Sequence, residues 1–338
     1  MKPEKEQEFK EILAQIEAKD ERLQKVNLND FGLDNDDVLL LVKVLPQSQI
    51  TSLSLPGNYI GSSAAALAEA LPQSQVINLD LSNDQPTKWR SGGSSGAIAL
   101  AKTLPNSQVV SLNLAGNDIG WDGAKALADI LPQSKITNIN LSDNKIGDVG
   151  VVALAKSLPQ SRVIMLDLSK NYIKTAEMTA LVKVLAKSQI KVLNLSENSL
   201  EDSVAIALAK VLSESQITSL DLESTKIGNK GAIALAQALS KSQLNSFNLG
   251  KNNLTEDGIV VLAKALPQSN LISFNMSKNH MGRFVIKTLA KAMPQSQITN
   301  LNLADNQIAD AGAIELAKVL AQSQITNLNL ADNQIADA

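Results

Sequence analysis

The 338-residue sequence contains no cysteine, one histidine and few aromatic residues, which make up 3% of the chain. Without cysteine, the chain can form neither a disulfide scaffold nor a cysteine zinc site. The single histidine, His280, has no second imidazole with which to share a metal ion. Polar residues surround it, but a nucleophile–histidine–acid trio can be drawn around any histidine in a polar protein. We therefore expect no catalytic residues, no metal and no cofactor.

The chain also has a small net charge and lacks long apolar segments. The formal net charge is −3, which argues against nucleic acid as a partner. No apolar run approaches the roughly 18 residues of a transmembrane helix, and residues 1–24 lack the apolar core of a signal peptide. We expect no membrane insertion. The expected location is the cytoplasm, or a host cell reached through a secretion signal that cannot be recognised in the sequence.

The sequence does have one 27-residue unit, repeated about twelve times. Its anchor is the pattern LxLxxN, and from Asn117 onward the anchor recurs every 27 residues. Such an array predicts a solenoid in which each unit packs on its neighbours. In successive units, the last position of the anchor is occupied by Phe31, Asn58, Asp84, Asn117, Asn144, Asn171, Asn198, Thr225, Asn252, Asn279, Asn306 and Asn333.

The unit at 131–158 shows the local pattern. Ile139 and Leu141 alternate with polar residues, which predicts a short strand. Asn144 follows in a turn, where its amide can bond unpaired backbone groups, so the repeated asparagines should form a ladder. A helical pattern comes next and stops at Pro159. Neighbouring strands lie about 4.8 Å apart, whereas neighbouring helices need about 8–10 Å, so the array should curve with its strands inside. We therefore expect a right-handed α/β solenoid, a horseshoe with parallel strands on its concave face and helices on its convex face.

Two further residue types recur in register. A serine follows each helix and is expected to bond local backbone as a turn former. A lysine near the helix ends complements the helix dipole by about 0.3–1 kcal/mol, although a ridge of lysines could instead meet acidic lipids or nucleic acid. The serines are Ser48, Ser74, Ser107, Ser134, Ser161, Ser188, Ser215, Ser242, Ser269, Ser296 and Ser323. The lysines are Lys43, Lys102, Lys156, Lys183, Lys210, Lys264, Lys291 and Lys318.

The two ends of the chain differ from the array. Residues 1–25 are expected to form an N-terminal helical cap, or a partner-binding helix, with residues 4–22 helical. Its apolar stripe comprises Phe9, Ile12, Leu13 and Ile16. The array is expected to run over residues 26–338.

At the C-terminus, residues 295–311 and 322–338 are identical, and the chain stops inside a repeat. Such an end would leave apolar residues bare. We expect either truncation of a longer protein, which we favour, or cover by another copy or domain. The chain is expected to be monomeric unless this end pairs.

The repeat itself resembles a known class. The pattern LxLxxNxIGxxGAxALAxAL, carried by residues 112–131 and 301–320, is similar to ribonuclease-inhibitor-like leucine-rich repeats. That class also occurs in Ran GTPase-activating protein, in NOD-like receptors and in bacterial effectors. The uniform unit length departs from ribonuclease inhibitor, and the LPQSQ connectors look most like an effector array. The resemblance implies protein recognition on a solenoid scaffold.

The third unit contains an insertion at 85–96 that predicts a protruding loop carrying Trp89 and Arg90. Exposed tryptophan beside cations is typical of interface hot spots, although Trp89 could also fold back on the scaffold. The predicted concave face is small and polar, so we place the candidate partner-binding surface on the rim that follows the strands. Its residues are Tyr59, Trp89, Arg90, Trp121 and Tyr172.

The function that these features predict is non-catalytic recognition of a protein partner. The specific form is a bacterial effector that binds a host protein. The alternatives are a regulator of a small GTPase and a structural scaffold within a larger protein.

Overall fold

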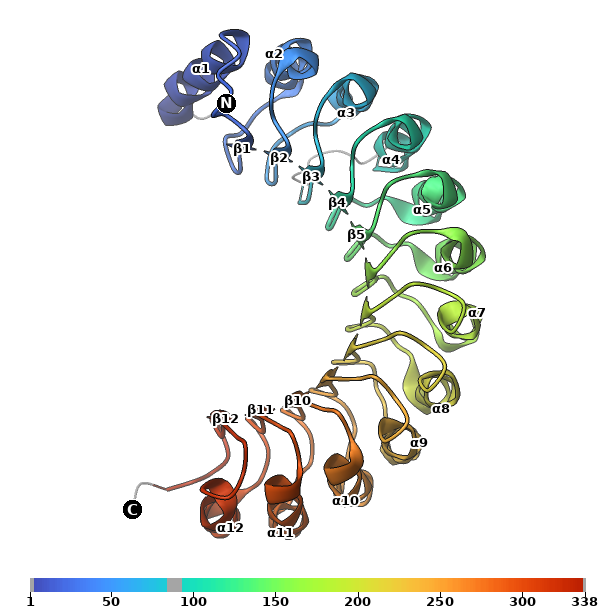
Figure 1. The fold of residues 1–338 in the computed structure, drawn as a ribbon, viewed down its shortest axis with the longest axis vertical. Helices are drawn as coiled ribbons and strands as arrows, with labels where there is room; N and C mark the ends of the chain where they lie inside the picture. Colours follow the sequence, from blue (N-terminus) through green and yellow to red (C-terminus); the bar gives the residue numbers. More distant parts are fainter. Residues whose placement is uncertain (1–2, 84–92, 337–338) are drawn as a thin grey trace. The chain divides into compact units, whose positions relative to one another are not determined.

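The computed structural model describes residues 3–83 and 93–336. In these residues, three-residue strands alternate with helices along the whole chain (Figure 1). The strands are β1 (Lys25–Asn27), β2 (Ser52–Ser54), β3 (Asn78–Asp80), β4 (Ser111–Asn113), β5 (Asn138–Asn140), β6 (Met165–Asp167), β7 (Val192–Asn194), β8 (Ser219–Asp221), β9 (Ser246–Asn248), β10 (Ser273–Asn275), β11 (Asn300–Asn302) and β12 (Asn327–Asn329). The helices are α1 (Pro3–Glu17), α2 (Asn35–Val44), α3 (Ser63–Ala70), α4 (Gly93–Thr103), α5 (Gly120–Ile130), α6 (Gly147–Ser157), α7 (Thr175–Leu185), α8 (Glu201–Val211), α9 (Asn229–Leu239), α10 (Glu256–Ala265), α11 (Arg283–Ala292) and α12 (Ala309–Leu320).

The chain divides into two compact units, Met1–Tyr172 and Ile173–Ala338. Within each unit the strands pair in parallel and in chain order, and the register advances by one repeat at each step. Asn138 thus pairs with Met165 in the N-terminal unit. The strands of each unit line its inner side, and the helices line its outer side (Figure 1). This arrangement confirms the predicted α/β solenoid.

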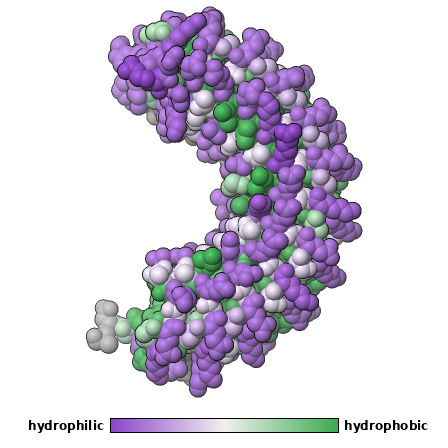
Figure 2. Space-filling model, in the orientation of Figure 1, coloured by the Kyte–Doolittle hydropathy of each residue, from purple (hydrophilic) through white to green (hydrophobic). Residues whose placement is uncertain are grey.

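The core of each unit lies between its strands and its helices. Ile139 and Leu141, the alternating apolar residues of one repeat, are both buried. Small residues let adjacent helices approach closely: a Cβ added at Gly150 of α6 would lie 3.0 Å from the Ala124 Cβ of α5. The face of the molecule shown in Figure 2 is mostly hydrophilic.

The recurring serines and lysines occupy scaffold positions, as expected. The Ser134 hydroxyl donates to the Leu131 carbonyl at 3.1 Å and accepts the Ile136 N–H at 3.4 Å. The same bond to the carbonyl three residues earlier recurs from Ser48 to Ser323. The lysines lie in the last turns of their helices, as Lys156 does in α6. Pro159 lies two residues after the end of α6, within a short 3-10 turn, Leu158–Gln160.

The N-terminal helix is shorter than the sequence predicted, because α1 ends at Glu17 rather than at residue 22. Lys19 adopts a left-handed backbone with a φ of 54°. Its N–H donates to the Ile16 carbonyl, and the Asp20 N–H donates to the Gln15 carbonyl. This is a Schellman motif, which ends a helix. Phe9 and Ile16 are buried, and the remaining stripe residues are half-buried.

The insertion predicted as a loop over 85–96 is helical in its last four residues, since α4 begins at Gly93. Packing provides the reason: a Cβ at Gly123 of α5 would lie 3.2 Å from the Ser94 Cα. Contact between neighbouring helices thus overrides the low helix propensity of glycine. The rest of the insertion, with Trp89 and Arg90, lies outside the described residues.

Candidate partner-binding surface

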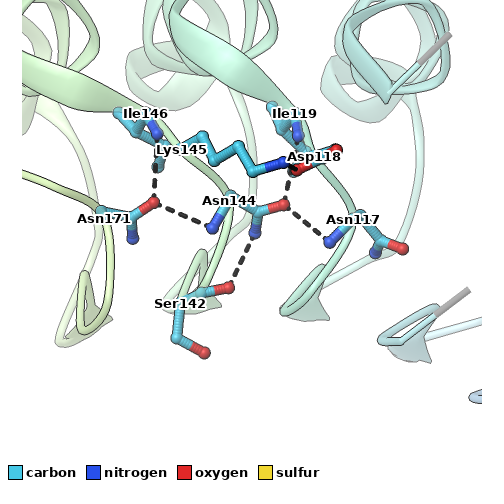
Figure 3. A network of polar contacts seen from close by, with 8 residues as sticks. All are labelled: Asn117, Asp118, Ile119, Ser142, Asn144, Lys145, Ile146 and Asn171. Carbon is cyan, nitrogen blue, oxygen red and sulfur yellow. Dashed lines mark hydrogen bonds and ion pairs between the residues drawn. The ribbon is translucent and has the colours of Figure 1, made fainter. Parts of the chain in front are cut away.

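The turn after each strand is built around the anchor asparagine. The Asn144 Oδ1 accepts the backbone N–H of Asn117 at 2.9 Å and that of Ile119 at 3.2 Å. The Asn144 Nδ2 donates to the carbonyls of Leu114 and Ser142 at 2.7 and 3.0 Å. Asn144 is fully buried. One side chain therefore ties its own turn to the turn of the preceding repeat (Figure 3).

The same arrangement recurs along both units, which confirms the predicted asparagine ladder. Asn171 accepts the Asn144 N–H at 3.0 Å, and Asn333 accepts the Asn306 N–H at 3.1 Å. At Thr225, a hydroxyl replaces the amide and donates to the Leu222 carbonyl at 2.7 Å. The ladder therefore holds successive turns at a regular spacing.

The residue directly after each anchor lies on the rim of the strand layer. In the described part of the N-terminal unit, this position carries Tyr59, Asp118, Lys145 and Tyr172, besides Gly32 of the first repeat. Tyr59 is 47% exposed and Tyr172 is 70% exposed. Because neighbouring strands lie about 4.8 Å apart, the four steps from Tyr59 to Tyr172 span about 19 Å. The two tyrosines thus mark the ends of a line rather than a compact patch.

A charged pair lies between the two tyrosines on this line. The Lys145 Nζ lies 2.6 Å from the Asp118 Oδ1 (Figure 3). The hydrogen bond to Asp118 raises the pKa of Lys145 above its ordinary value of 10.5, and the charges of Asp118, Tyr172 and Asp143 act in the same direction. Both partners are largely exposed. Lys145 was not among the candidates predicted from the sequence, although it shares the repeat position of Tyr59 and Tyr172.

Trp121 is placed differently from the tyrosines. It lies in the first turn of α5, four residues after Asn117, and is 51% exposed. The described rim therefore combines two tyrosines, one helix-borne tryptophan and an ion pair, all in the N-terminal unit. We use the term aromatic rim for Tyr59, Trp121 and Tyr172. Trp89 and Arg90, the other candidates, lie outside the described residues.

The strand face that adjoins the rim is mostly small and polar. The third residue of most strands caps its own turn: the Asn140 Oδ1 accepts the Ser142 N–H at 2.9 Å. Two strands have an apolar residue on this face: Met165 of β6, with 42% exposure, and the half-buried Val192 of β7. In the C-terminal unit, an open hollow of about 570 Å³ lies over β10, β11 and β12 and is lined mainly by serine, threonine and asparagine. Phe247 and Phe274 are buried and stacked with ring centroids 5.8 Å apart.

The described residues contain no group of three or more histidine, cysteine, aspartate or glutamate residues placed to hold a metal ion. No helix within residues 3–83 and 93–336 is both long and apolar enough to cross a membrane. His280 is exposed, and its backbone N–H donates to the Leu254 carbonyl at 2.9 Å.

Comparison with known proteins agrees with this architecture. A family model described as Leucine Rich repeat matches residues 106–128, 133–155, 216–236 and 298–317. These four segments are therefore similar to leucine-rich repeats, and the fold of the chain is a leucine-rich-repeat solenoid. No curated protein matches the sequence.

Two solved structures share the fold. One is an internalin (inlF) from Listeria monocytogenes str. 4b F2365, with 16% identity, a TM-score of 0.51, and coverage of 96% of this chain and 84% of that one. The other is the leucine-rich repeat-containing protein LegL7 from Legionella pneumophila, with 22% identity, a TM-score of 0.51, and coverage of 89% of this chain and 97% of that one. At such identities the likeness concerns the fold alone.

Proposed function

We propose that this chain is a non-catalytic protein-recognition module that binds its partner through the aromatic rim. The observation that carries the proposal is the exposure of Tyr59, Trp121 and Tyr172 on a framework fixed by buried asparagines. Tyrosine and tryptophan dominate interface hot spots, because they bury a large area at a low cost in side-chain entropy. The Asp118–Lys145 pair between the tyrosines supplies polar contacts.

The specific form of the proposal is a bacterial effector of the ribonuclease-inhibitor-like repeat class that binds a host protein. The support is the resemblance of the repeat units, together with a fold shared with proteins of two bacteria. The site of action is then the cytoplasm of the host cell.

Affinity capture from eukaryotic lysate tests this function. The native chain is compared with the aromatic-rim variant Tyr59→Ala/Trp121→Ala/Tyr172→Ala, after circular dichroism melts show equal stability. Loss of two or three hot-spot side chains is expected to weaken binding at least 100-fold. The matched control replaces Leu39, Leu40 and Ile77, which are exposed apolar residues away from the aromatic rim, by alanine.

A host protein that the native chain and the control retain, and that the aromatic-rim variant loses, supports the proposal. Equal capture by all three chains would remove the aromatic rim from the function. No specific capture by any of them would favour the structural-scaffold alternative. Faster GTP hydrolysis by a captured small GTPase would favour the regulatory alternative.

A further inference from the structure

The turns of the C-terminal unit carry a cluster of basic residues on three consecutive repeats. Lys226, Lys251, Lys278 and His280 directly precede or follow the anchor residues of the β8, β9 and β10 repeats. All four side chains are exposed. We call the three lysines, with His280, the basic turns.

Backbone pairing brings these turns together. The Lys251 N–H donates to the Ser277 carbonyl at 2.8 Å, and Ser277 directly precedes Lys278. The two lysines therefore lie on adjacent turns, about 5 Å apart at the backbone. Lys226, Lys251 and Lys278 all have a left-handed backbone, with φ values of 62°, 53° and 53°. Glycine or asparagine suits that conformation better, so turn geometry alone does not explain lysine at these positions.

The three lysines have no counter-charge within the described residues, since no ion pair there includes Lys226, Lys251 or Lys278. Two nearby acids, one on the β8 repeat and one on α8 of the preceding repeat, are engaged elsewhere. Glu223 accepts a bond from the Asn248 side chain at 3.1 Å. Asp202 accepts backbone N–H groups at the start of α9. Glu256 and Asp257 lie in the first turn of α10.

The cluster is bounded by acids on both sides along the rim. The turn before it carries Glu197, and the two turns after it carry Asp305 and Asp332. From β8 to β10 the basic turns span about 10 Å, a length that three or four residues of an extended chain cover at about 3.3 Å each. A longer polyanion such as nucleic acid would place phosphates against Glu197 or Asp305, where like charges repel.

We propose that the basic turns bind a short acidic segment of a partner protein. The interaction extends the protein-recognition function proposed above and rests on it, but it uses a different surface in the other unit. Carboxylates of the segment would pair with Lys226, Lys251 and Lys278. The pairing would also remove the repulsion among these lysines in the unbound protein.

Binding of fluorescein-labelled hexaglutamate to the full chain, measured by fluorescence anisotropy at low ionic strength, tests this proposal. The variant Lys226→Asn/Lys251→Asn/Lys278→Asn removes the three cations and places asparagine, which tolerates the left-handed backbone. The control Lys183→Gln/Lys210→Gln/Lys264→Gln removes three helix lysines and so changes the net charge equally. We expect the first variant to bind about tenfold more weakly and the control within about twofold of the native chain.

Three results would overturn the proposal: no binding of hexaglutamate, equal weakening in both lysine variants, or tighter lysine-dependent binding of a single-stranded hexanucleotide or of phosphatidylserine vesicles. The aromatic-rim variant separates this proposal from the general one. It is expected to bind hexaglutamate normally, even if the aromatic rim proves to have no role in partner capture.

Discussion

The side-chain oxygen of Asn144 accepts the backbone N–H of Asn117, 27 residues earlier, at 2.9 Å. The same oxygen accepts the Ile119 N–H, and the Asn144 amino group donates to the Leu114 carbonyl. A single buried side chain thus satisfies three main-chain groups of the preceding repeat. Because these groups lie away from water, the ladder fixes each turn and therefore the exposed side chains beside it.

Asn144→Ala is expected to lower the free energy of unfolding by about 3 kcal/mol, because it leaves the buried N–H groups of Asn117 and Ile119 without the acceptor that Asn144 provides. The Leu114 carbonyl keeps its bond from the Asn117 Nδ2 at 3.0 Å. Urea denaturation followed by circular dichroism measures the loss. The control is Asn253→Ala, at an exposed position beside the ladder, which should change stability by no more than about 0.5 kcal/mol. Equal effects of the two substitutions would contradict a stabilising ladder.

Thr225 interrupts the ladder, and restoring asparagine there should stabilise the C-terminal unit. The equivalent Asn252 reaches the Leu222 carbonyl, 30 residues earlier, at 2.8 Å. Thr225→Asn would reach the Leu195 carbonyl in the same way, which we expect to raise stability by about 1 kcal/mol. Thr225→Val removes the hydroxyl and should lower stability instead. Thermal melts of the three chains decide the order, and a less stable Thr225→Asn chain would refute this account.

Gly150→Ala is expected to destabilise the N-terminal unit by about 1–2 kcal/mol, although alanine is usually the better helix former. An added Cβ would lie 2.2 Å from the Ile146 Cγ2 and 3.0 Å from the Ala124 Cβ. Chemical denaturation measures the effect. Val149→Ala, at the exposed neighbouring position on α6, serves as the control and should stay within about 0.5 kcal/mol. A stabilised Gly150→Ala chain would show that the helices can separate at little cost.

The raised pKa of Lys145 predicts a pH dependence on the rim. The contribution of its pair with Asp118 is complete below the ordinary lysine pKa of 10.5 and is lost as the pH rises through the higher folded-state pKa. Asp118→Asn should lower the pKa of Lys145, because it removes the carboxylate that causes most of the rise. NMR titration of the Lys145 side chain measures this pKa.

Asp122→Asn removes a neighbouring acid that forms no ion pair with Lys145, so it provides the control. Its titration should leave the pKa of Lys145 nearly unchanged. Since the Asp118–Lys145 pair is exposed and screened by salt, neither substitution should alter stability noticeably at neutral pH. A Lys145 pKa that is the same in all three chains would disprove the assignment to Asp118.

Much of the candidate surface could be predicted from repeat register. Tyr59 and Tyr172 were placed on the rim because each follows an anchor asparagine, and both are exposed there. Trp121 was also expected on the rim, and it lies four residues after Asn117, in the first turn of α5. Lys145 was overlooked because a charged residue after an anchor has no distinctive pattern. Its importance depends on its ion pair with Asp118 of the preceding repeat.

The sequence by itself determined the repeat length, the parallel register, the buried leucines and the asparagine ladder. These features follow from the spacing of residues along the repeats. Because each unit packs on its neighbour, residues at the same repeat position occupy equivalent places in the structure. Tertiary structure alone decided that α1 ends at Glu17, that α4 begins at Gly93, and that Asp118 pairs with Lys145. It also placed Lys251 and Lys278 on adjacent turns, where neither forms an ion pair with another described residue. Such outcomes depend on contacts between side chains and turns of adjacent units. These contacts compete with the conformational preferences of individual residues and produce no periodic pattern in the sequence.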